Sequence, residues 1–349
     1  MIIIRISESE YGILKNIPKA LHYTEVAEKA GFTVAYVSVK IKDLMNKARI
    51  TFIPDYWKMG LIPSFMLFED KGYSVEYFEK PYVMSIGKII GEKEYFFVKA
   101  VIPEEHLKTY IDIFREKPVF HEIGLVEFHW NPASPLVVYS REGFDAKLED
   151  FTKVFEKELE QVEIFTVSKR VSLDELDLYI IKEKMRDPFK SLTSMGKSVE
   201  KSQQLVSYHF HKHVFPLWKY NAVTLYQDYK SNPLGLYFFE FPDARTAKGF
   251  ARALTYLPYT YITFLSTSRP LVIYIANIPS HKILEFCKLV QSIRRKNMLS
   301  TFTFKGYLDP EAFKEYTISY KDVLKNGEWV LTGKGLREVA EELPFKLPQ

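Results

Sequence analysis

The sequence predicts an α+β protein that uses one plan twice: a winged helix-turn-helix domain followed by a ferredoxin-like β-α-β-β-α-β module. Two repeated patterns predict this plan. The strand end Ala100–Pro103 and the helix-like stretch after it recur at Ala276–Pro279, and closely spaced helix starts precede each such module. Hydrophobic residues make up 47% of the 349 residues, which is enough to form sizeable cores.

Each helical domain is expected to open with a capping box, at Ser7–Glu10 in the first copy and at Ser172–Glu175 in the second. In such a box the first and last side chains bond each other's backbone N–H groups, which otherwise lack partners at a helix start. The later helix starts are expected near Thr24 and at Thr33, and near Thr193 and at Ser202. These short connections are typical of a helix-turn-helix, and a wing is expected at residues 50–56.

Each sheet module is expected to hold four strands and two helices, because apolar alternation and turn residues divide the sequence in that way. The expected strands are 64–69, 82–89, 94–102 and 119–128 in the first module, and 235–241, 259–266, 271–278 and 300–307 in the second. The expected helices are 73–78, 104–114, 244–257 and 280–290. In helix 104–114 the residues Leu107, Tyr110, Ile111 and Phe114 would share one face.

The predicted organisation divides the chain into six parts. They are a winged helix-turn-helix at 1–60, a ferredoxin-like domain at 61–130, a connector at 131–170, a second winged helix-turn-helix at 171–232, a second ferredoxin-like domain at 233–308 and a C-terminal extension at 309–349. The connector contains a charged helix near 146–159 and is expected to pack on the first half.

The third helix of each helical domain carries the residues that point to DNA. Val37, Ile41 and Leu44 can face one core, and Val206 and Phe210 the other. Small, hydroxyl, amide and basic side chains face outward, as in a helix that enters a major groove. The predicted DNA-binding residues are Thr33, Val34, Ala35, Tyr36, Ser38, Lys40, Lys42 and Lys47 in the first head, and Ser202, Gln203, Gln204, Ser207, Tyr208, His209, His211 and Lys212 in the second.

These patterns resemble the Lrp/AsnC (feast/famine) family of transcriptional regulators, as an internally duplicated, archaeal-type member. The resemblance rests on Leu173–Leu178, Ser191–Thr193 and Ser202–Tyr208, and on Thr24–Ala27 with Gly31–Thr33 in the first copy. It implies RAM/ACT-like sensing modules, double-stranded DNA as partner, a small-molecule effector at those modules and pairing into a homodimer. It also implies that the two modules of one chain pair with each other. Glu200 replaces the turn glycine Gly31, so the second turn must accept another geometry or some strain.

Composition also bears on the cellular compartment and on the kinds of partner. The single cysteine, Cys287, forms no internal disulfide or cysteine zinc cluster, which favours a reducing compartment. No apolar run reaches the roughly 20 residues that cross a bilayer, and no signal peptide is recognised. We therefore expect a cytoplasmic protein with no membrane partner. The net charge of +4 alone does not indicate nucleic acid.

No motif for phosphate binding, nucleophilic catalysis or a metalloprotease occurs, so we expect no enzyme, no catalytic residue and no cofactor. His209 and His213 share a helical face, but no nearby carboxylate pair or cysteine completes a metal site, so no metal is predicted.

Two alternatives remain. Siroheme decarboxylases resemble the same two-module plan and would need histidines and arginines lining a cleft between the sheet modules. The candidate histidines, by their proximity to those modules, are His106, His121, His129 and His281. The other alternative is a factor that contacts the transcription machinery without reading DNA bases.

Overall fold

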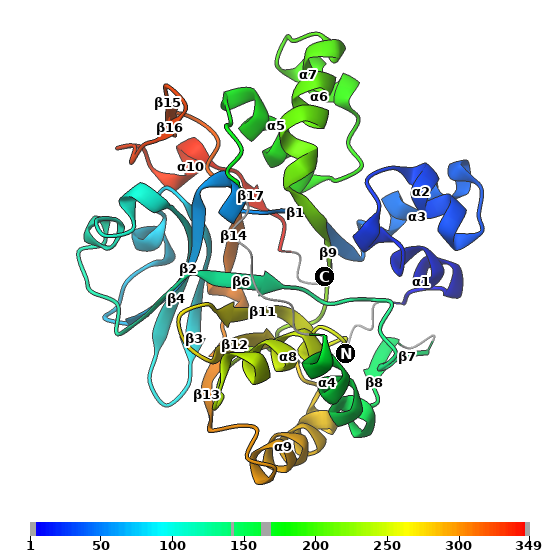
Figure 1. Ribbon diagram of the computed structural model, residues 1–349, viewed down its shortest axis with the longest axis vertical. Coiled ribbons are helices and arrows are strands. Elements are labelled where there is room, and N and C mark those ends of the chain that lie inside the picture. Colours follow the sequence, from blue (N-terminus) through cyan, green and yellow to red (C-terminus); the bar gives the residue numbers. More distant parts are fainter. Residues whose placement is uncertain (1–4, 141–142, 162–168, 346–349) are drawn as a thin grey trace.

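Two β-sheets that face each other form the centre of the computed structural model, which describes residues 5–140, 143–161 and 169–345 (Figure 1). The strands of the first half are β2 (Leu61–Glu69), β3 (Val83–Ile90), β4 (Tyr95–Pro103), β5 (Phe120–Ile123) and β6 (Leu125–Phe128). Those of the second half are β10 (Gly235–Glu240), β11 (Thr260–Ser266), β12 (Leu271–Ala276), β13 (Thr301–Leu308) and β14 (Lys314–Tyr316). All pairings between these strands are antiparallel, and the facing sides are apolar and rich in phenylalanine.

The last strand of each half crosses to the sheet of the other half. After β5 pairs with β2, the chain bends at Gly124, where φ is 78°, and β6 pairs with β11. Similarly, β13 pairs with β10 as far as Tyr307, and beyond Gly306, where φ is 135°, its end at Tyr307 and Leu308 also pairs with β3. The expectation that the two modules pair within one chain is therefore confirmed, and the two sheets form one continuous hydrogen-bonded structure.

The outer faces of the two sheets are covered differently. In the second half α8 (Ala244–Leu254) and α9 (Ser280–Arg295) lie where helices are expected. In the first half the expected helix 104–114 is wrong, since only two short 3-10 turns form there. Tertiary contacts override the helical pattern: Tyr110 is fully buried and donates its hydroxyl to the Pro81 carbonyl at 2.6 Å.

The segment that follows each crossing strand covers the outer face of the opposite half. The connector helix α4 (Phe151–Glu160) packs on α8 of the second half, which corrects the expectation that the connector packs on the first half. The hairpin of β7 (Val137–Ser140) and β8 (Gly143–Ala146) instead contacts the first head. The C-terminal segment covers the first half. Its elements are β15 (Leu324–Lys325), β16 (Glu328–Trp329), α10 (Leu336–Val339) and β17 (Glu342–Leu343).

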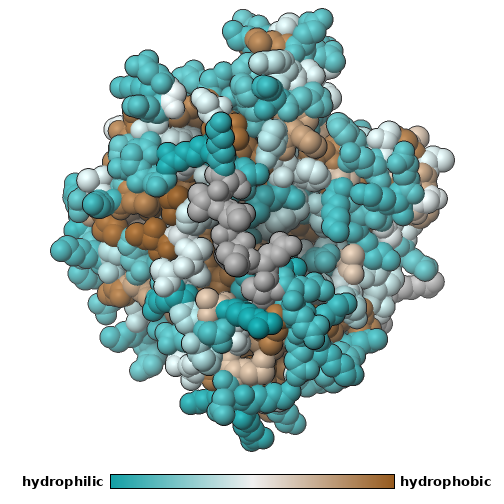
Figure 2. Space-filling model, viewed as in Figure 1, coloured by the Kyte–Doolittle hydropathy of each residue, from teal (hydrophilic) through white to brown (hydrophobic). Residues whose placement is uncertain are grey.

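Two helical heads stand on this body. Head 1 contains α1 (Glu8–Leu14), α2 (Tyr23–Ala30) and α3 (Val34–Leu44), and head 2 contains α5 (Glu175–Arg186), α6 (Leu192–Ser198) and α7 (Gln203–His209). Figure 2 shows mainly hydrophilic residues over the visible face of both heads. The stacked rings of Tyr23 and Phe189, with centroids 5.0 Å apart, join the two heads directly.

The expected wing at residues 50–56 is wrong. This stretch belongs mostly to β1 (Ala48–Pro54), which pairs along its length with β9 (Trp218–Leu225) from the second half. The ribbon lies between the heads and the sheets, so the side chains of β1 are almost all buried, whereas those of β9 are partly exposed. Each head therefore reaches the body through a strand that is paired with its counterpart.

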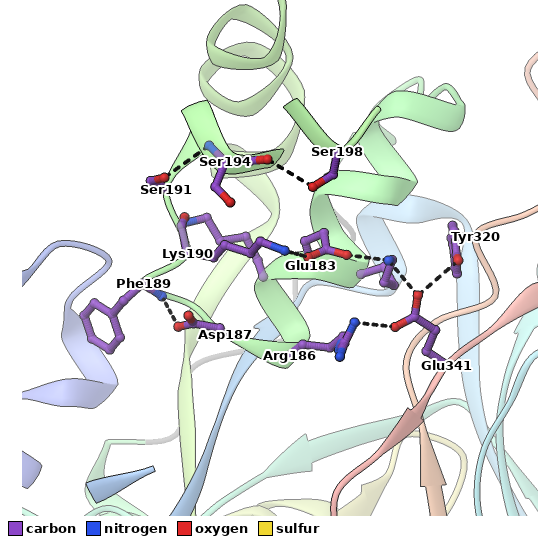
Figure 3. Close-up of polar contacts among 12 residues, drawn as sticks. Glu183, Arg186, Asp187, Phe189, Lys190, Ser191, Ser194, Ser198, Tyr320 and Glu341 are labelled. Atoms are coloured by element: carbon purple, nitrogen blue, oxygen red, sulfur yellow. Dashed lines mark hydrogen bonds and ion pairs between the residues drawn. The ribbon is translucent and has the colours of Figure 1, made fainter. Parts of the chain in front are cut away.

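Head 2 is further tied to the C-terminal segment by a network of charged side chains, which Figure 3 shows in close-up. Glu341 accepts from Lys182 at 2.8 Å and from Arg186 at 2.6 Å, while Glu183 binds Lys182 and Lys190. The buried core of head 2 is also continuous with the outer core of the first half. The core of head 1 is separate from this one and also contains Trp130, Phe189, Val223 and Leu225 from other parts of the chain.

Candidate active site between the two sheets

Charged and phenolic side chains gather at the point where the β1–β9 ribbon meets the space between the sheets. We call this group the central cluster. Its members are Arg49, Tyr56, Lys99, Glu127, His129, Tyr220, Tyr261 and Glu315. They come from both heads' strands and from both halves of the body, and all are buried or half-buried.

Two ion pairs form the charged part of the central cluster. Lys99 on β4 donates to Glu127 on β6 at 2.9 Å, with both side chains 10% exposed or less. Arg49 on β1 is paired with Glu315 on β14, and its Nη2 donates to the Tyr261 hydroxyl at 3.2 Å. Each pair therefore joins segments that are far apart in the sequence.

Both ion pairs leave one buried polar atom without a protein partner. Arg49 Nε and Glu127 Oε1 make no hydrogen bond within the described ranges 5–140, 143–161 and 169–345. Buried polar groups are nearly always hydrogen-bonded, and a buried ion pair contributes little net stability because both charges lose water. The two free atoms indicate that the central cluster accommodates a further polar group, such as a water molecule or part of a ligand.

His129 is the neutral member of the central cluster. Its Nδ1 lies 3.0 Å from the Tyr220 hydroxyl, which itself donates to the Glu127 carbonyl at 3.2 Å. Burial, and next the positive charges of Lys99 and Arg49, hold the pKa of His129 well below its ordinary value. Burial also raises the pKa of Tyr220, so the imidazole is neutral and the phenol protonated at neutral pH.

From this low pKa we predict how the stability of the protein changes with pH below neutrality. Below about pH 6.5 the unfolded chain protonates His129 while the folded chain does not, so stability is complete above that pH and falls as the pH drops toward the folded pKa. His129→Asn keeps a polar group near Tyr220 but cannot titrate. We expect its urea midpoint to fall less steeply than that of the unaltered protein between about pH 7 and about pH 5.

The matched control is His281→Asn, because His281 is 65% exposed and lies outside the central cluster. It should keep the slope of the unaltered protein. Burial also lowers the pKa of His121. Because His121 is present in all three proteins, its contribution cancels when their slopes are compared. Equal slopes for His129→Asn and the unaltered protein would show that His129 does not titrate as proposed.

A pocket of about 320 Å³ opens between the sheets at the edge formed by β5 and β13. We call it the inter-sheet pocket. The guanidinium of Arg269 lies 5.2 Å from the Phe120 ring centroid, and the Lys305 ammonium lies 5.4 Å from that of Phe238. The buried Glu122 holds Arg269 in place through a 2.7 Å bond to its Nε. The lining thus combines two cations and two aromatic faces with one carboxylate, that of Glu240.

An aromatic block separates the inter-sheet pocket from the central cluster. Phe65 stacks on Phe97 with centroids 5.5 Å apart and also contacts Phe238 and Phe264. The Lys99 ammonium lies 5.8 Å from the Phe264 centroid on the other side of this block. Between the sheets, the inter-sheet pocket at the open edge is therefore lined by cations and aromatic rings, whereas the central cluster contains ion pairs.

Of the four histidines considered for a cleft enzyme, His129 lies in the central cluster and the others lie elsewhere. His121 bonds Ser64 at 2.9 Å, and His106 lies 3.0 Å from the Trp329 carbonyl. His281 is on the surface beside Asp145. The structure therefore does not collect these histidines into one site.

The residues predicted to bind DNA lie on α3 and α7, at the N-caps of these helices and in the segments that follow them. Most are exposed, including Val34, Tyr36, Gln203, Tyr208 and Lys212. The hydroxyls of Thr33 and Ser202 accept bonds from backbone N–H groups and so cap these helices. The remaining exposed positions are Ala35, Lys42, Gln204 and His211, and the half-exposed ones are Ser38, Lys40 and Ser207.

Three basic residues of the heads are already engaged within the protein. Lys47 donates to Glu10 at 2.7 Å. His209 is not exposed as expected, because its ring packs inward and lies 2.9 Å from Asp177. Arg49, which follows head 1 on β1, belongs to the central cluster.

The charged residues between the sheets are not among those predicted from the sequence. Lys99 and Glu127 stand within otherwise apolar strands, and a charge at such a position is the signal that could have marked them. Arg269 and Glu315 lie in a turn and in the C-terminal extension. The residues around Arg269 and Glu315 in the sequence give no sign that both segments reach the space between the two sheets.

No protein-family model and no curated protein sequence matches the chain. Among solved structures, that of siroheme decarboxylase NirDL is similar with a TM-score of 0.51 and 12% identity, covering 86% of this chain and 91% of that one. AsnC of E. coli matches with a TM-score of 0.29 and 13% identity over 38% of this chain and 89% of that one. The regulator PF0864 of Pyrococcus furiosus matches with a TM-score of 0.27 and 17% identity over 38% of this chain and 87% of that one.

The first likeness shows a shared fold. It contradicts the expectation that the chain is not an enzyme, because the fold shared over 86% of its length is that of an enzyme. Within the described part of the chain, no helix is long and apolar enough to cross a membrane.

Proposed function

We propose that the chain is an enzyme that binds a carboxylate-bearing tetrapyrrole between its two sheets and acts on those carboxylates, as a siroheme decarboxylase does. The observation that carries this proposal is the inter-sheet pocket, where Arg269 and Lys305 lie over the rings of Phe120 and Phe238. A tetrapyrrole is flat and aromatic with acidic groups at its edge. Ring faces and cations are the two features that its recognition requires.

The size of the pocket limits how such a ligand enters. About 320 Å³ lies at the lower end of the range for small-molecule sites, so one edge of the macrocycle would be enclosed. Arg269 is preorganised by Glu122 and can bind a carboxylate through its remaining N–H groups. Among the described residues Lys305 forms no ion pair, so its charge is available to a second carboxylate.

Decarboxylation breaks a carbon–carbon bond, releases carbon dioxide and leaves an electron pair on carbon that must take up a proton. Tyr95 lines the inter-sheet pocket and carries a hydroxyl that can supply this proton. We assign the proton donor to Tyr95 and carboxylate binding to Arg269 and Lys305. The central cluster lies behind the aromatic block and would hold the two sheets in register.

We test this proposal by titrating the purified protein with siroheme and following the absorption spectrum of the tetrapyrrole. The unaltered protein should shift the spectrum, and Arg269→Ala or Lys305→Ala should each weaken binding about 10- to 100-fold, since a bond to a charged group contributes about 1.5–3 kcal/mol. Tyr95→Phe should bind normally but convert siroheme more slowly, as judged by mass spectrometry of the products.

Lys288→Ala is the matched control, because Lys288 is exposed on α9 and lies outside the pocket lining. It should bind like the unaltered protein. Absence of any spectral shift with the unaltered protein would overturn the proposal, as would equal losses for Lys288→Ala and Arg269→Ala.

DNA binding is a second candidate function, supported by the exposed polar face of α7. Together with His211 and Lys212 of the π-helical turn that follows α7, Gln203, Gln204 and Ser207 line a shallow surface hollow, as base-reading side chains of a recognition helix would. The face of α3 differs, because Val34, Tyr36 and Val39 expose apolar surface. Two unlike heads fixed by the β1–β9 ribbon would read an asymmetric site with half-sites about 10 bp apart.

If the heads bind DNA, their exposed lysines contact phosphates. Lys42→Ala and Lys212→Ala should each lower the slope of log affinity against log salt by about one unit. Lys153→Ala on α4 provides the control, because its side chain is 80% exposed and α4 packs beneath the second half. Fluorescence anisotropy with duplex DNA measures the slopes. Unchanged slopes for both head variants would exclude these helices as the DNA-binding surface.

A further inference from the structure

Two imidazoles and a carboxylate meet inside head 2. Asp177 of α5 lies 2.9 Å from His209 Nδ1 through its Oδ1, and 3.0 Å from His213 Nδ1 through its Oδ2. The three ligating atoms all lie within 4.8 Å of one another. From this geometry we infer that Asp177, His209 and His213 form a binding site for a divalent transition-metal ion such as Zn²⁺.

The local backbone is built to bring the two histidines to one side. The α-helix α7 ends at His209 and continues as a π-helical turn over Phe210–Val214, in which His213 lies. π-helical turns are rare and occur often at functional sites, because the extra residue changes the direction of the side chains that follow. The two rings lie 5.3 Å apart with their planes at 84°, so their Nδ1 atoms converge on Asp177.

Asp177 comes from a different helix and is itself held in place. Its Oδ2 accepts from the Asp174 N–H at 3.0 Å, and Asp174 Oδ1 accepts from the Asp177 N–H at 2.9 Å, which is a reciprocal cap at the start of α5. α5 and α7 lie side by side in head 2 (Figure 1). Asp177 precedes His209 by 32 residues, which explains why no carboxylate is apparent near the histidines in the sequence.

The set of ligands suits a transition metal. Imidazole nitrogens bind Zn²⁺, Ni²⁺, Co²⁺ and Fe²⁺, and two histidines with one carboxylate leave positions for water or a further ligand. Asp174 Oδ1 lies 3.6 Å from His209 Nδ1 and accepts from the Asp177 N–H, so it supports the site from beside it. Both rings would carry their proton on Nε2 when Nδ1 binds the ion.

The charge around the carboxylate also favours a cation. Asp177 is fully buried, and its ionisable neighbours within the described residues are the two histidines and Asp174, with no lysine or arginine paired to it. A buried carboxylate needs a compensating positive charge, which a divalent ion supplies. Access is open on one side, where His213 is 26% exposed and the exposed Tyr208 ring stands 5.9 Å from it.

Metal binding would join α5 to the end of α7, the helix whose outer face carries Gln203 and Gln204. The ion would therefore fix the orientation of head 2's exposed helix. This role is separate from the inter-sheet pocket, so it stands or falls independently of the tetrapyrrole proposal.

The test uses the full chain after treatment with a chelator, titrated with Co²⁺ and followed by visible absorption. The unaltered protein should develop the intense bands of a four- or five-coordinate ion, and Zn²⁺ should displace Co²⁺ and remove them. His213→Ala should weaken Co²⁺ binding by more than about 100-fold. The reason is that loss of a residue that only hydrogen-bonds a metal ligand already lowers metal affinity by about 10- to 100-fold. Asp177 is left unchanged because it also caps α5.

His211→Ala is the matched control, because His211 lies on the same turn but is exposed and outside the triad. It should bind Co²⁺ like the unaltered protein. Zn²⁺ should raise the melting temperature of the unaltered protein and of His211→Ala, and should leave that of His213→Ala unchanged. A cooperative melting transition of His213→Ala without metal shows that this variant is folded. Absence of Co²⁺ bands in the unaltered protein, or an equal loss in both variants, would overturn the proposal.

Discussion

Replacing Arg49 with methionine is expected to lower the free energy of unfolding by about 3–5 kcal/mol, because removing one partner of a buried pair leaves the other charge uncompensated. Glu315 would lose its ion pair, and Tyr261 would lose the hydrogen bond from Arg49 Nη2. Urea unfolding followed by far-UV circular dichroism measures the loss as a lower midpoint.

The double variant Arg49→Met with Glu315→Leu separates charge from packing. With both charges gone and similar volumes kept, most of the lost stability should return, since buried ion pairs are often replaceable by apolar residues. Lys40→Met is the control on α3, because the nearest acid to Lys40 is the exposed Asp43 at 3.7 Å. If the double variant is as unstable as Arg49→Met, the loss of stability comes from altered side-chain packing and not from the unpaired charge of Glu315.

Gly306→Ala is the second substitution with a large expected effect, about 2–5 kcal/mol, from backbone strain combined with overpacking. Gly306 has φ 135°, and an added Cβ would lie 2.4 Å from the Ile90 carbonyl oxygen. Gly91 on the facing segment is equally constrained, since its Cβ would meet the Lys305 carbonyl at 2.3 Å. The two glycines thus allow β13 to approach β3 at the crossing.

Gly333→Ala serves as the control, because nothing lies within 4 Å of an added Cβ and its φ is not positive. It should unfold at the same urea concentration as the unaltered protein or slightly above it. If Gly306→Ala is as stable as Gly333→Ala, the crossing strand can shift to accept a side chain, and the junction is less constrained than the close approach indicates.

The local features of the heads follow from the sequence. The Ser7–Glu10 capping box forms, with Ser7 N–H donating to Glu10 at 2.7 Å, and Thr33 and Ser202 cap their helices as predicted. Val37 and Phe210 are buried as expected. Such features depend on residues within one or two turns, so the sequence contains the information directly.

Small errors in the heads also have local causes. The second capping box is at Asp174–Asp177 instead of Ser172–Glu175, because two aspartates satisfy the same backbone groups two residues later. Glu200 takes the position of the turn glycine with φ 55°, so the strained option of the sequence analysis is the one that occurs.

The larger errors concern partners that are distant in the sequence. β1 was expected to form a wing, and its partner β9 lies in the other half of the chain. His209 was placed on the surface because its helical position gave no sign of Asp177. The central cluster is not predicted for the same reason, because Arg49 and its partner Glu315 lie at opposite ends of the chain.

The crossing strands also set the order in which the chain can complete itself during synthesis. The edge of β3 finds its partner only when Tyr307 and Leu308 arrive, roughly 200 residues after Ile90. At translation rates of about 5–20 residues per second, this edge waits on the order of 10–40 s. An unpaired strand edge is a template for association with other chains. The nascent first half would therefore expose this strand edge to other chains until the end of β13 has been synthesised.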